Sequence, residues 1–563
     1  MLKRILFIFI CLVIYFKINA QHNTQFDSSV QINKMAVTGK IWGLIKYYNP
    51  VILQKKVDWD MVFINSYDSL KNASTKESYN KQLLNLLLKA KMKPKAFSKI
   101  DSIGAKLILN GELSKLSNFS FINDTSNFIR QPDFTWINNN EILSAEVKNT
   151  LIRLILDYKP VKNKYLEVGK KIAFTHVENP FSKIDSVNEA YRILALFRYW
   201  NIINYYFPYQ TLIDKNWDSV LVENIPLFSS SNTYFDYFYR IRHLTSEISD
   251  THADFTEIDD KKGLKQKPTS NTYSPTYYYP PIKVEMINSK LIIGDVLDDS
   301  LNKNGTIQKG DELLMINNYN PSYAVASLRY FTANSSEQSF INVVKYRLVS
   351  NYFSDTALFN FILLRARDTV KIDNIQGLKW SAYWTLSWNN EKDTIPPYYT
   401  INDSLGYINL GKINSREIKK AINKYQNLQA IIFDMRGYPN GFAPIFLPKM
   451  FSKKPIAVAN FYYPYKKYAG VFVKNKREEN YYLENSVSLG FKLIFNTNKK
   501  LFPTFNKVYK GKVIVLIDEE AASYAETVCM ILKAYAKNAV FIGRPTQGSN
   551  GDIINFSCQG ELT

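Results

Sequence analysis

The feature that most constrains this chain is an internal repeat. The stretch IWGLIKYYNPVILQKKVDWDMV, which begins at Ile41, aligns with YWNIINYYFPYQTLIDKNWDSV, which begins at Tyr199. Six residues recur in register, each 158 positions apart: Trp42, Tyr47, Tyr48, Pro50, Trp59 and Asp60 correspond to Trp200, Tyr205, Tyr206, Pro208, Trp217 and Asp218. The apolar positions follow a helical spacing and each first helix ends at a proline, so the repeat predicts two paired helical modules whose aromatic stripe is core.

The two copies differ in one polar segment that could take part in a reaction. After its second helix, copy two reads YRIRHLTSEISDTHADF, whereas copy one reads NKQLLNLLLKAKMKPKAF and has no Asp-Thr-His. His252 therefore stands out among only four histidines. His243 and His176 do not follow the repeat in a polar turn, and we expect them to be structural.

The N-terminus has the order of a secretory signal peptide. Lys3 and Arg4 precede an apolar run from Ile5 to Phe16, and a small residue follows at Ala20, after which we expect cleavage. This predicts an exported protein, periplasmic or extracellular. The apolar run is shorter than the roughly 20 residues of a membrane span, and an uncleaved N-terminal anchor is the alternative. No later segment has the composition of a membrane span.

Charge and cysteine content exclude some functions. The net charge of +21 comes from lysines scattered along the whole chain, without the basic arm or cluster typical of nucleic-acid binding. After signal cleavage only Cys529 and Cys558 remain, which do not make a disulfide framework. We expect no nucleic acid, no cofactor and no metal.

The middle of the chain predicts a small β-rich domain. Residues 257–281 are rich in Lys, Ser, Thr, Tyr and Pro and are interpreted as a linker. The strand-like runs KLIIGDVL and DELLMINN then flank the turn IQKGD, and a helical stretch follows at about 323–331. This order resembles a PDZ domain, with a generic β-rich domain as the alternative; the matching residues are Gly310, Asp311, Leu313, Leu314, Ile316 and Asn317.

After Pro397 strand-like and helical runs alternate, which predicts a largely parallel sheet with its ligand site beyond the carboxyl ends of the strands. The run GKVIVLIDEEAASYAETV places Ser523 at the start of a helix. The positive end of a helix favours a developing oxyanion, so Ser523 is a candidate nucleophile. The alternative is that Ser523 only caps the helix, with Glu526 completing a capping box.

Three motifs in this region, taken together, resemble the C-terminal processing and tricorn-like serine peptidases of the S41 type. The first motif is FDMRGYPNG, with Phe442 where the family has a second glycine; the others surround Ser523 and follow it. The matching residues are Asp434, Arg436, Gly437, Asn440 and Gly441, then Ala521, Ser523 and Glu526, then Gly543, Thr546 and Gly548. The resemblance implies an α/β catalytic domain of the ClpP/crotonase-like kind, with Ser523 as the nucleophile.

The resemblance also suggests how the serine is activated. Where the processing branch has a lysine this chain has Ser549, whereas His252 preceded by Thr251 matches the histidine of the tricorn-like branch. A histidine can act as general base and then as general acid. The oxyanion donors would be the backbone amides of Tyr524 and Gly441. Residues Asp434, Arg436, Gly437 and Asn440 would contact substrate, or Asp434 and Arg436 would form only a structural ion pair.

The expected fold is therefore a multidomain α+β and α/β protein. The predicted parts are a signal peptide (1–20), helical module copy one (21–165), copy two (166–256), the linker (257–281), a PDZ-like domain (282–390) and an α/β catalytic domain (396–563). The predicted function is an exported serine endopeptidase whose polypeptide substrate binds partly through its C-terminus at the PDZ-like domain. A catalytically weak or inactive protein that binds peptides or apolar ligands is the alternative.

The end of the chain carries one more expectation. The tricorn-like pattern has an assisting glutamate several tens of residues after the nucleophile, but only fifteen residues follow Gly548. Glu561 is the sole acidic candidate after Asp552, and it lies two residues from the end. We therefore expect a C-terminally truncated chain that lacks the acid orienting His252.

Overall fold

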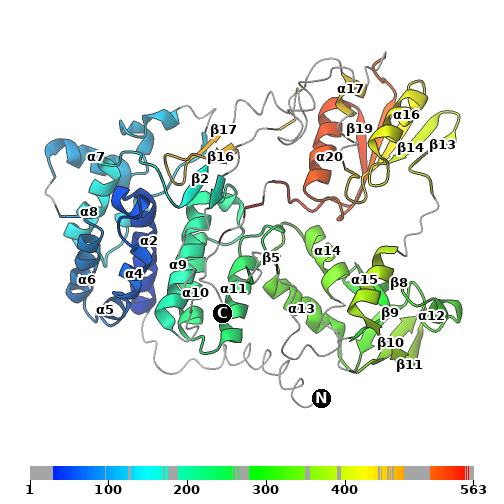
Figure 1. Cartoon of the computed structure of the whole chain (residues 1–563), viewed down its shortest axis with the longest axis horizontal. Helices are drawn as coiled ribbons and strands as arrows, with labels where there is room; N and C mark the ends of the chain where they lie inside the picture. Colours follow the sequence, from blue (N-terminus) through cyan, green and yellow to red (C-terminus); the bar gives the residue numbers. More distant parts are fainter. Residues whose placement is uncertain are drawn as a thin grey trace.

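The computed structural model describes residues 29–94, 97–123, 128–168, 172–174, 188–255, 258–259, 264–265, 278–348, 356–389, 395–441, 444, 447–452, 456, 458–459, 462–474, 507–551, 553–554 and 556. The predicted signal peptide, most of the predicted linker, His176 and Glu561 lie outside these residues. Figure 1 shows three regions: a helical region in blue and teal, an antiparallel sheet in green, and a parallel sheet in yellow to red.

The helical region contains both copies of the repeat. Copy one consists of α2 (Ser29–Tyr48), α3 (Pro50–Leu53), α4 (Trp59–Ile64), α5 (Tyr67–Lys71) and α6 (Lys76–Lys89). Copy two consists of α9 (Glu189–Tyr206), the short helix η4 (Gln210–Leu212), α10 (Trp217–Ser229) and α11 (Tyr234–Ser246). Helices α7 (Lys99–Leu109) and α8 (Ala145–Leu156) lie between the copies in sequence. Each first helix ends just before a proline, as the repeat predicts.

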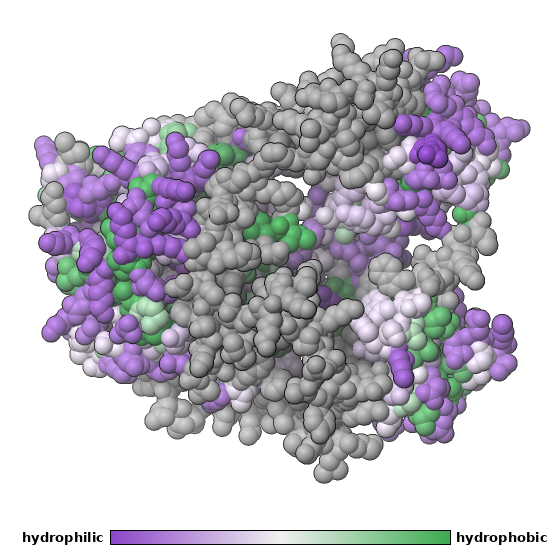
Figure 2. Space-filling view, viewed as in Figure 1, coloured by the Kyte–Doolittle hydropathy of each residue, from purple (hydrophilic) through white to green (hydrophobic). Residues whose placement is uncertain are grey.

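The copies share side-chain hydrogen bonds as well as helices. The Trp59 indole donates to the Trp42 carbonyl at 3.0 Å, and the equivalent Trp217 indole donates to the Trp200 carbonyl at 3.0 Å. All four tryptophans are buried, which confirms that the aromatic stripe is core. On the face seen in Figure 2, the described surface over copy one is largely hydrophilic.

Equivalent residues also cap equivalent helices. Asp58 accepts from the Met61 amide at 3.1 Å, and Asn216, 158 positions later, accepts from the Ser219 amide at 3.1 Å. Thr75 and Thr233 cap α6 and α11 in the same way. The sequence repeat is thus a repeat of helix ends and core contacts.

The two copies pack against each other through α2 and α9 about an approximate two-fold axis. Equivalent residues touch across this interface: Gly39 contacts Phe197, Gly43 contacts Asn201, and the Tyr47 and Tyr205 rings lie 5.2 Å apart. The ion pairs are reciprocal as well, because Lys40 pairs with Asp218 and its equivalent Arg198 pairs with Asp60. Such an arrangement, in which one patch meets its own equivalent, is that of a two-fold dimer interface.

The antiparallel-sheet region has the strand order β11-β10-β9-β8-β7. Its strands are β7 (Ile282–Ile287), β8 (Lys290–Val296), β9 (Glu312–Ile316), β10 (Leu358–Arg365) and β11 (Asp368–Gln376). Helices α12 (Asp299–Lys303), α13 (Pro321–Phe331), α14 (Glu337–Arg347) and α15 (Trp380–Asn389) accompany it. The two strands and the helix expected from the sequence are present as β8, β9 and α13.

The parallel-sheet region has the strand order β13-β14-β15-β18-β19. Only β13 (Tyr398–Asn402) is antiparallel; β14 (Leu405–Asn409), β15 (Ala430–Asp434), β18 (Lys512–Ile517) and β19 (Ala539–Gly543) are parallel. Helices α16 (Ser415–Tyr425), α17 (Leu447–Phe451) and α20 (Tyr524–Tyr535) complete it. The prediction of a largely parallel sheet is confirmed, and the carboxyl ends of β15 and β18 lie next to each other.

One segment of this region docks on the helical region, which the sequence did not indicate. Strands β16 (Tyr462–Pro464) and β17 (Phe472–Lys474) pair with β1 (Phe128–Arg130). The Gly470 amide donates to the Tyr205 carbonyl at 3.0 Å, and the Tyr158 hydroxyl donates to the Lys467 carbonyl at 2.8 Å. The two regions are therefore joined by a three-stranded sheet. Across the described ranges no helix is both long and apolar enough to cross a membrane.

Candidate active site

Ser523 lies between β18 and α20 with an unusual backbone conformation. Its φ is 52° and its ψ is −111°, whereas Asn414, which caps α16, has an extended conformation with φ −91° and ψ 171°. A positive φ is rare in residues other than glycine, and such strain concentrates at functional sites. The helix behind Ser523 buries Ala525, Val528, Leu532 and Tyr535, as the helical spacing predicts. Ser523 is thus held on a tightly packed turn.

Glu526 binds this turn to the loop that carries the third motif. Its buried carboxylate accepts hydrogen bonds from four groups: the amides of Ser523 (3.2 Å), Gly548 (2.7 Å) and Ser549 (2.9 Å), and the Thr546 hydroxyl (2.8 Å). The predicted contact between Glu526 and the Ser523 backbone is therefore one part of a larger network. A carboxylate that accepts several amides is strongly held, so Glu526 fixes both segments.

Two backbone hydrogen bonds reinforce the same junction. The Ser523 amide donates to the Ser549 carbonyl at 2.9 Å, and the Gln547 amide donates to the Ala521 carbonyl at 3.1 Å. Ser549, which stands where the processing branch has a lysine, is itself buried. The second and third motifs, separated by about twenty residues of sequence, form one surface.

The first motif follows β15, the neighbouring strand. The Arg436 guanidinium donates to both carboxylate oxygens of Asp434, at 3.1 and 2.7 Å, and the Tyr407 hydroxyl donates to the same carboxylate at 2.6 Å. Burial raises the pKa of Asp434, but these hydrogen bonds outweigh it and leave the pKa below its usual value. Asp434 is buried whereas Arg436 is half-exposed, so the structural ion pair exists and still leaves one face of Arg436 open.

The glycines of this motif have conformations that other residues rarely adopt. Gly437 has φ 129° and Gly441 has φ 55°, and an added Cβ would meet nothing within 4 Å at either position. The conformation, not crowding, therefore requires glycine. Between them, the Tyr438 ring lies 6.2 Å from the ring of Tyr524, the residue after Ser523. This contact brings the first motif to the turn that carries Ser523.

Thr251 reaches the same surface through Ser335 of the antiparallel-sheet region. The Ser335 hydroxyl accepts from the Thr251 amide at 2.9 Å and lies 3.0 Å from the Thr251 hydroxyl. Ser335 also lies next to Gly548, where an added Cβ would be 3.7 Å from the Ser335 Cβ, and the Ser336 hydroxyl donates to the Gln547 carbonyl at 2.8 Å. One residue thus separates Thr251 from the loop bound to Ser523.

His252 follows Thr251, and the contacts given by the structure join it to Asp250. Its amide donates to the Asp250 carboxylate at 2.9 Å, and its Nδ1 lies 3.7 Å from the same oxygen. Within the described residues no hydrogen bond joins the His252 ring to the Ser523 hydroxyl. His243 has a structural environment, as expected: its ring stacks on Tyr330 at 3.9 Å and pairs with Glu247 at 3.1 Å.

Sequence reasoning missed a buried ion cluster on the turn that precedes Ser523. Glu519, which is 1% exposed, pairs with Arg544 at 2.6 Å and with Lys345 of α14 at 2.6 Å. Burial raises the pKa of Glu519, but the hydrogen bonds from Arg544 and Lys345 lower it to about 2. The only local signal was the acidic pair Glu519-Glu520 before the serine, and its partner on α14 is 174 positions away.

The arrangement can support acyl transfer. A serine hydroxyl at the positive end of a helix, beside a glycine-containing loop and a second loop held by Glu526, can attack a carbonyl whose oxyanion is stabilised by backbone amides. No cluster of three or more His, Cys, Asp or Glu side chains able to hold a metal occurs among the described residues.

Comparison with known proteins finds a family match for the parallel-sheet region. Residues 404–560 match the profile described as peptidase family S41. No curated protein matches the chain. Similar solved structures include mature CPAF (12% identity over 65% of this chain and 85% of that chain, TM-score 0.43) and the photosystem II D1 C-terminal processing protease (12%, 64% and 82%, 0.31). The tricorn protease is also similar (14%, 66% and 31%, 0.25).

Proposed function

We propose that the protein is an exported serine endopeptidase of family S41 with Ser523 as its nucleophile; residues 404–560 match the profile of that family. The observation that carries this proposal is the strained backbone of Ser523, at φ 52°, on a turn that Glu526 ties to the loop 546–549. An ordinary helix cap needs neither feature, because caps adopt extended conformations without strain.

In the proposed mechanism, the Ser523 hydroxyl oxygen attacks the carbonyl carbon of the scissile peptide bond. His252 takes the hydroxyl proton and then donates it to the leaving amine, and a water molecule hydrolyses the acyl-enzyme. The backbone amides of Tyr524 and Gly441 would stabilise the oxyanion. The half-exposed guanidinium of Arg436 would contact the substrate while Asp434 orients it.

His252 must approach Ser523 for this mechanism, and its position supports such a movement. Thr251 contacts Ser335, which lies against Gly548 beside the nucleophile turn. Apo geometry often shows catalytic hydrogen bonds that are long and tighten only when substrate binds. We propose that binding of a polypeptide, with its C-terminus towards the antiparallel-sheet region, brings the imidazole to the serine.

The decisive experiment is labelling with a fluorophosphonate. Wild-type protein should be labelled and should cleave an unstructured protein substrate, and S523A should do neither. The matched control is S144A, because Ser144 caps α8 by accepting from the Val147 amide at 3.3 Å. S144A should lose about 1 kcal/mol of stability and keep its activity. Labelling or cleavage that persists in S523A would show that Ser523 is only a cap.

The proposed export has a separate test. The full chain should be produced in a bacterium with its first 20 residues, and the N-terminus of the mature protein should be sequenced. We expect it to begin at Gln21 and to be released by periplasmic extraction. A protein that retains Met1 and remains with the membrane fraction would support the uncleaved anchor instead.

A further inference from the structure

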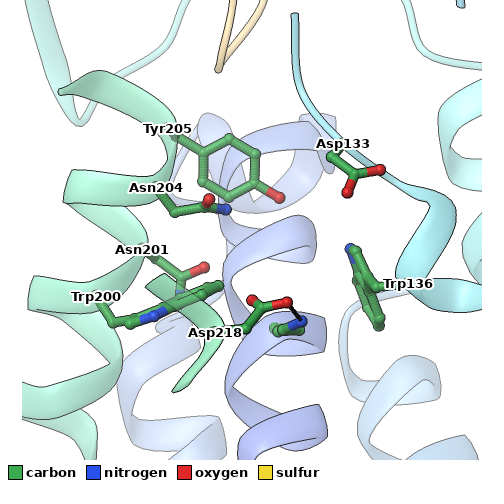
Figure 3. Close-up of a pocket in the computed structure, with 8 residues that line it drawn as sticks. Asp133, Trp136, Trp200, Asn201, Asn204, Tyr205 and Asp218 are labelled. Atoms are coloured by element: carbon green, nitrogen blue, oxygen red, sulfur yellow. Dashed lines mark ion pairs between the residues drawn. The ribbon is translucent and has the colours of Figure 1, made fainter. Parts of the chain in front are cut away.

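A cavity opens on one side of the interface between the two helical copies. It has a volume of about 40 Å³ and lies between α2, α9 and the segment before α8 (Figure 3). The groups that matter here are the side chains of Lys40, Trp136, Trp200, Asn204 and Asp218. Lys40 pairs with Asp218 at 2.7 Å, and its ammonium lies 5.7 Å from the Trp136 ring centroid and 5.9 Å from that of Trp200.

The two-fold axis places an equivalent site on the other side of the interface, and that site is filled. There Arg198 pairs with Asp60, as Lys40 pairs with Asp218. A second cation is also present: the Lys46 ammonium lies 3.7 Å from Asp60 and 4.6 Å from the Trp42 ring centroid. Tyr165 covers it at 4.8 Å. The Lys46 side chain is completely buried in this position.

The residue equivalent to Lys46, 158 positions later, is Asn204. The other members of the filled site have counterparts in the cavity: Trp200 for Trp42, Asp218 for Asp60 and Lys40 for Arg198. Each site also has a further aromatic ring beside a cation: Trp136 lies near the Lys40 ammonium, and Tyr165 lies near that of Lys46. The cavity is therefore the filled site without its second ammonium group, because a short amide stands where a long aliphatic cation would be.

We propose that this cavity binds a primary alkylammonium group, the chemistry shared by a lysine side chain and a small free amine. In the filled site two cations, Arg198 and Lys46, lie within pairing distance of the Asp60 carboxylate, whereas in the cavity Asp218 pairs with Lys40. One added ammonium would give Asp218 the second cation that Asp60 has.

The aromatic lining of the cavity suits such a cation. The indole rings of Trp136 and Trp200 attract cations through their negative π-faces, and both already lie within 6 Å of the Lys40 ammonium.

The first test is binding by the whole protein, followed through tryptophan fluorescence and calorimetry. n-Butylamine, protonated at neutral pH, should bind saturably, and n-butanol and butyrate should bind at least about tenfold more weakly. Nα-acetyl-lysine amide and Nα-acetyl-norleucine amide form a second matched pair, which separates the lysine side chain from the free amine as the source. Equal binding of butylamine and butanol would overturn the proposal.

Substitutions at position 204 locate the site. N204K supplies the missing ammonium covalently, so butylamine affinity should fall more than about tenfold while the melting temperature does not decrease. N204S is the matched control, which leaves the cavity open and should change the affinity less than about threefold. D218N should weaken binding by about tenfold. Wild-type affinity in N204K would place the amine elsewhere and overturn the proposal.

The filled site allows the reverse experiment, in which the ammonium is removed and not added. K46N removes the internal ammonium and creates the equivalent vacancy in copy one. Saturating butylamine should therefore raise the melting temperature of K46N by several degrees more than that of the wild-type protein, as a chemical rescue. An equal rise in both proteins would contradict the proposed equivalence. If K46N does not fold, the position 204 variants decide the question alone.

Discussion

The two helical copies have kept the same core and diverged at two polar sites. Trp59 and Trp217 make equivalent hydrogen bonds of the same length, and Thr75 and Thr233 cap equivalent helices. In contrast, the ion pair of Asp60 is buried whereas that of Asp218 borders a cavity. The core constrains substitution because packing is dense, and polar positions at the edge of an interface are free to change.

The second divergence concerns the end of each module. Copy two ends in Thr251 and His252 beside Ser335, whereas the equivalent positions of copy one are Lys93 and Pro94. Only copy two is followed by the segment that leads to the antiparallel sheet. One copy therefore serves as a structural partner, and the other contributes to the candidate active site.

The largest expected effect tests the difference between the ends of the two modules. H252A should reduce kcat/KM by about 10²–10⁴, because a general base contributes that much to the reaction. P94A, the equivalent change in copy one, should leave activity unchanged. Peptide hydrolysis over a range of pH measures both. Equal kinetics in H252A and wild type would remove His252 from the mechanism.

The next effect compares the two aspartates of the reciprocal ion pairs. D60N leaves Arg198 and Lys46 buried beside a neutral group, so unfolding in urea should show a loss of about 3–5 kcal/mol. D218N removes a half-exposed partner and should cost about 1 kcal/mol or less. Similar losses in the two variants would mean that the sites do not differ in burial.

The Asp60 carboxylate also makes the stability of the protein depend on pH in the acid range. Burial raises the pKa of Asp60, but the positive charges of Arg198 and Lys46 lower it by a larger amount, so the pKa lies below its usual value. The stability from this group is therefore present above the unfolded pKa of about 3.9 and is lost as the pH falls through the lower folded value. D60N lacks the titrating carboxylate, so its free energy of unfolding should fall less than that of the wild-type protein as the pH is lowered from 5. Denaturation curves recorded at each pH measure this.

A smaller effect tests the contact on the two-fold axis. An added Cβ at Gly43 would lie 1.8 Å from the Asn201 side-chain oxygen, so G43A should cost about 1–3 kcal/mol through overpacking. In the N201A background the opposing side chain is absent. There the G43A change should therefore cost less stability than it costs in the wild-type protein. G551A, where a Cβ meets nothing within 4 Å, is the control. An equal cost in the two backgrounds would contradict the proposed packing.

The smallest effect tests whether equivalent helix caps in the two copies contribute equal stability. T75A and T233A each remove a cap that accepts a first-turn amide at 3.1 Å, so each should cost about 1 kcal/mol. The two losses, measured by chemical denaturation, should agree to within about 0.5 kcal/mol. A difference larger than this would show that the copies share geometry without sharing energetics.

Much of the fold could be predicted from short stretches of sequence. The 158-residue offset indicated both helical copies, and the alternation after Pro397 indicated the parallel sheet with Asp434 and Ser523 at neighbouring strand ends. These features follow from local periodicity and from turn residues, which act over a few positions. The positive φ of Ser523 could not be predicted, because a serine before a helix is usually an extended cap.

The sequence by itself determined that two similar helical modules exist and that a serine stands on a helix N-terminus after a buried strand. Only the tertiary structure decided that the copies meet about a two-fold axis, that Glu519 pairs with Lys345, and that residues 462–474 dock on the helical region. It also decided that Asn204 borders a cavity where Lys46 fills its own site. The physical reason is distance along the chain: these contacts join residues tens to hundreds of positions apart, and no local pattern encodes which partner a buried charge will meet.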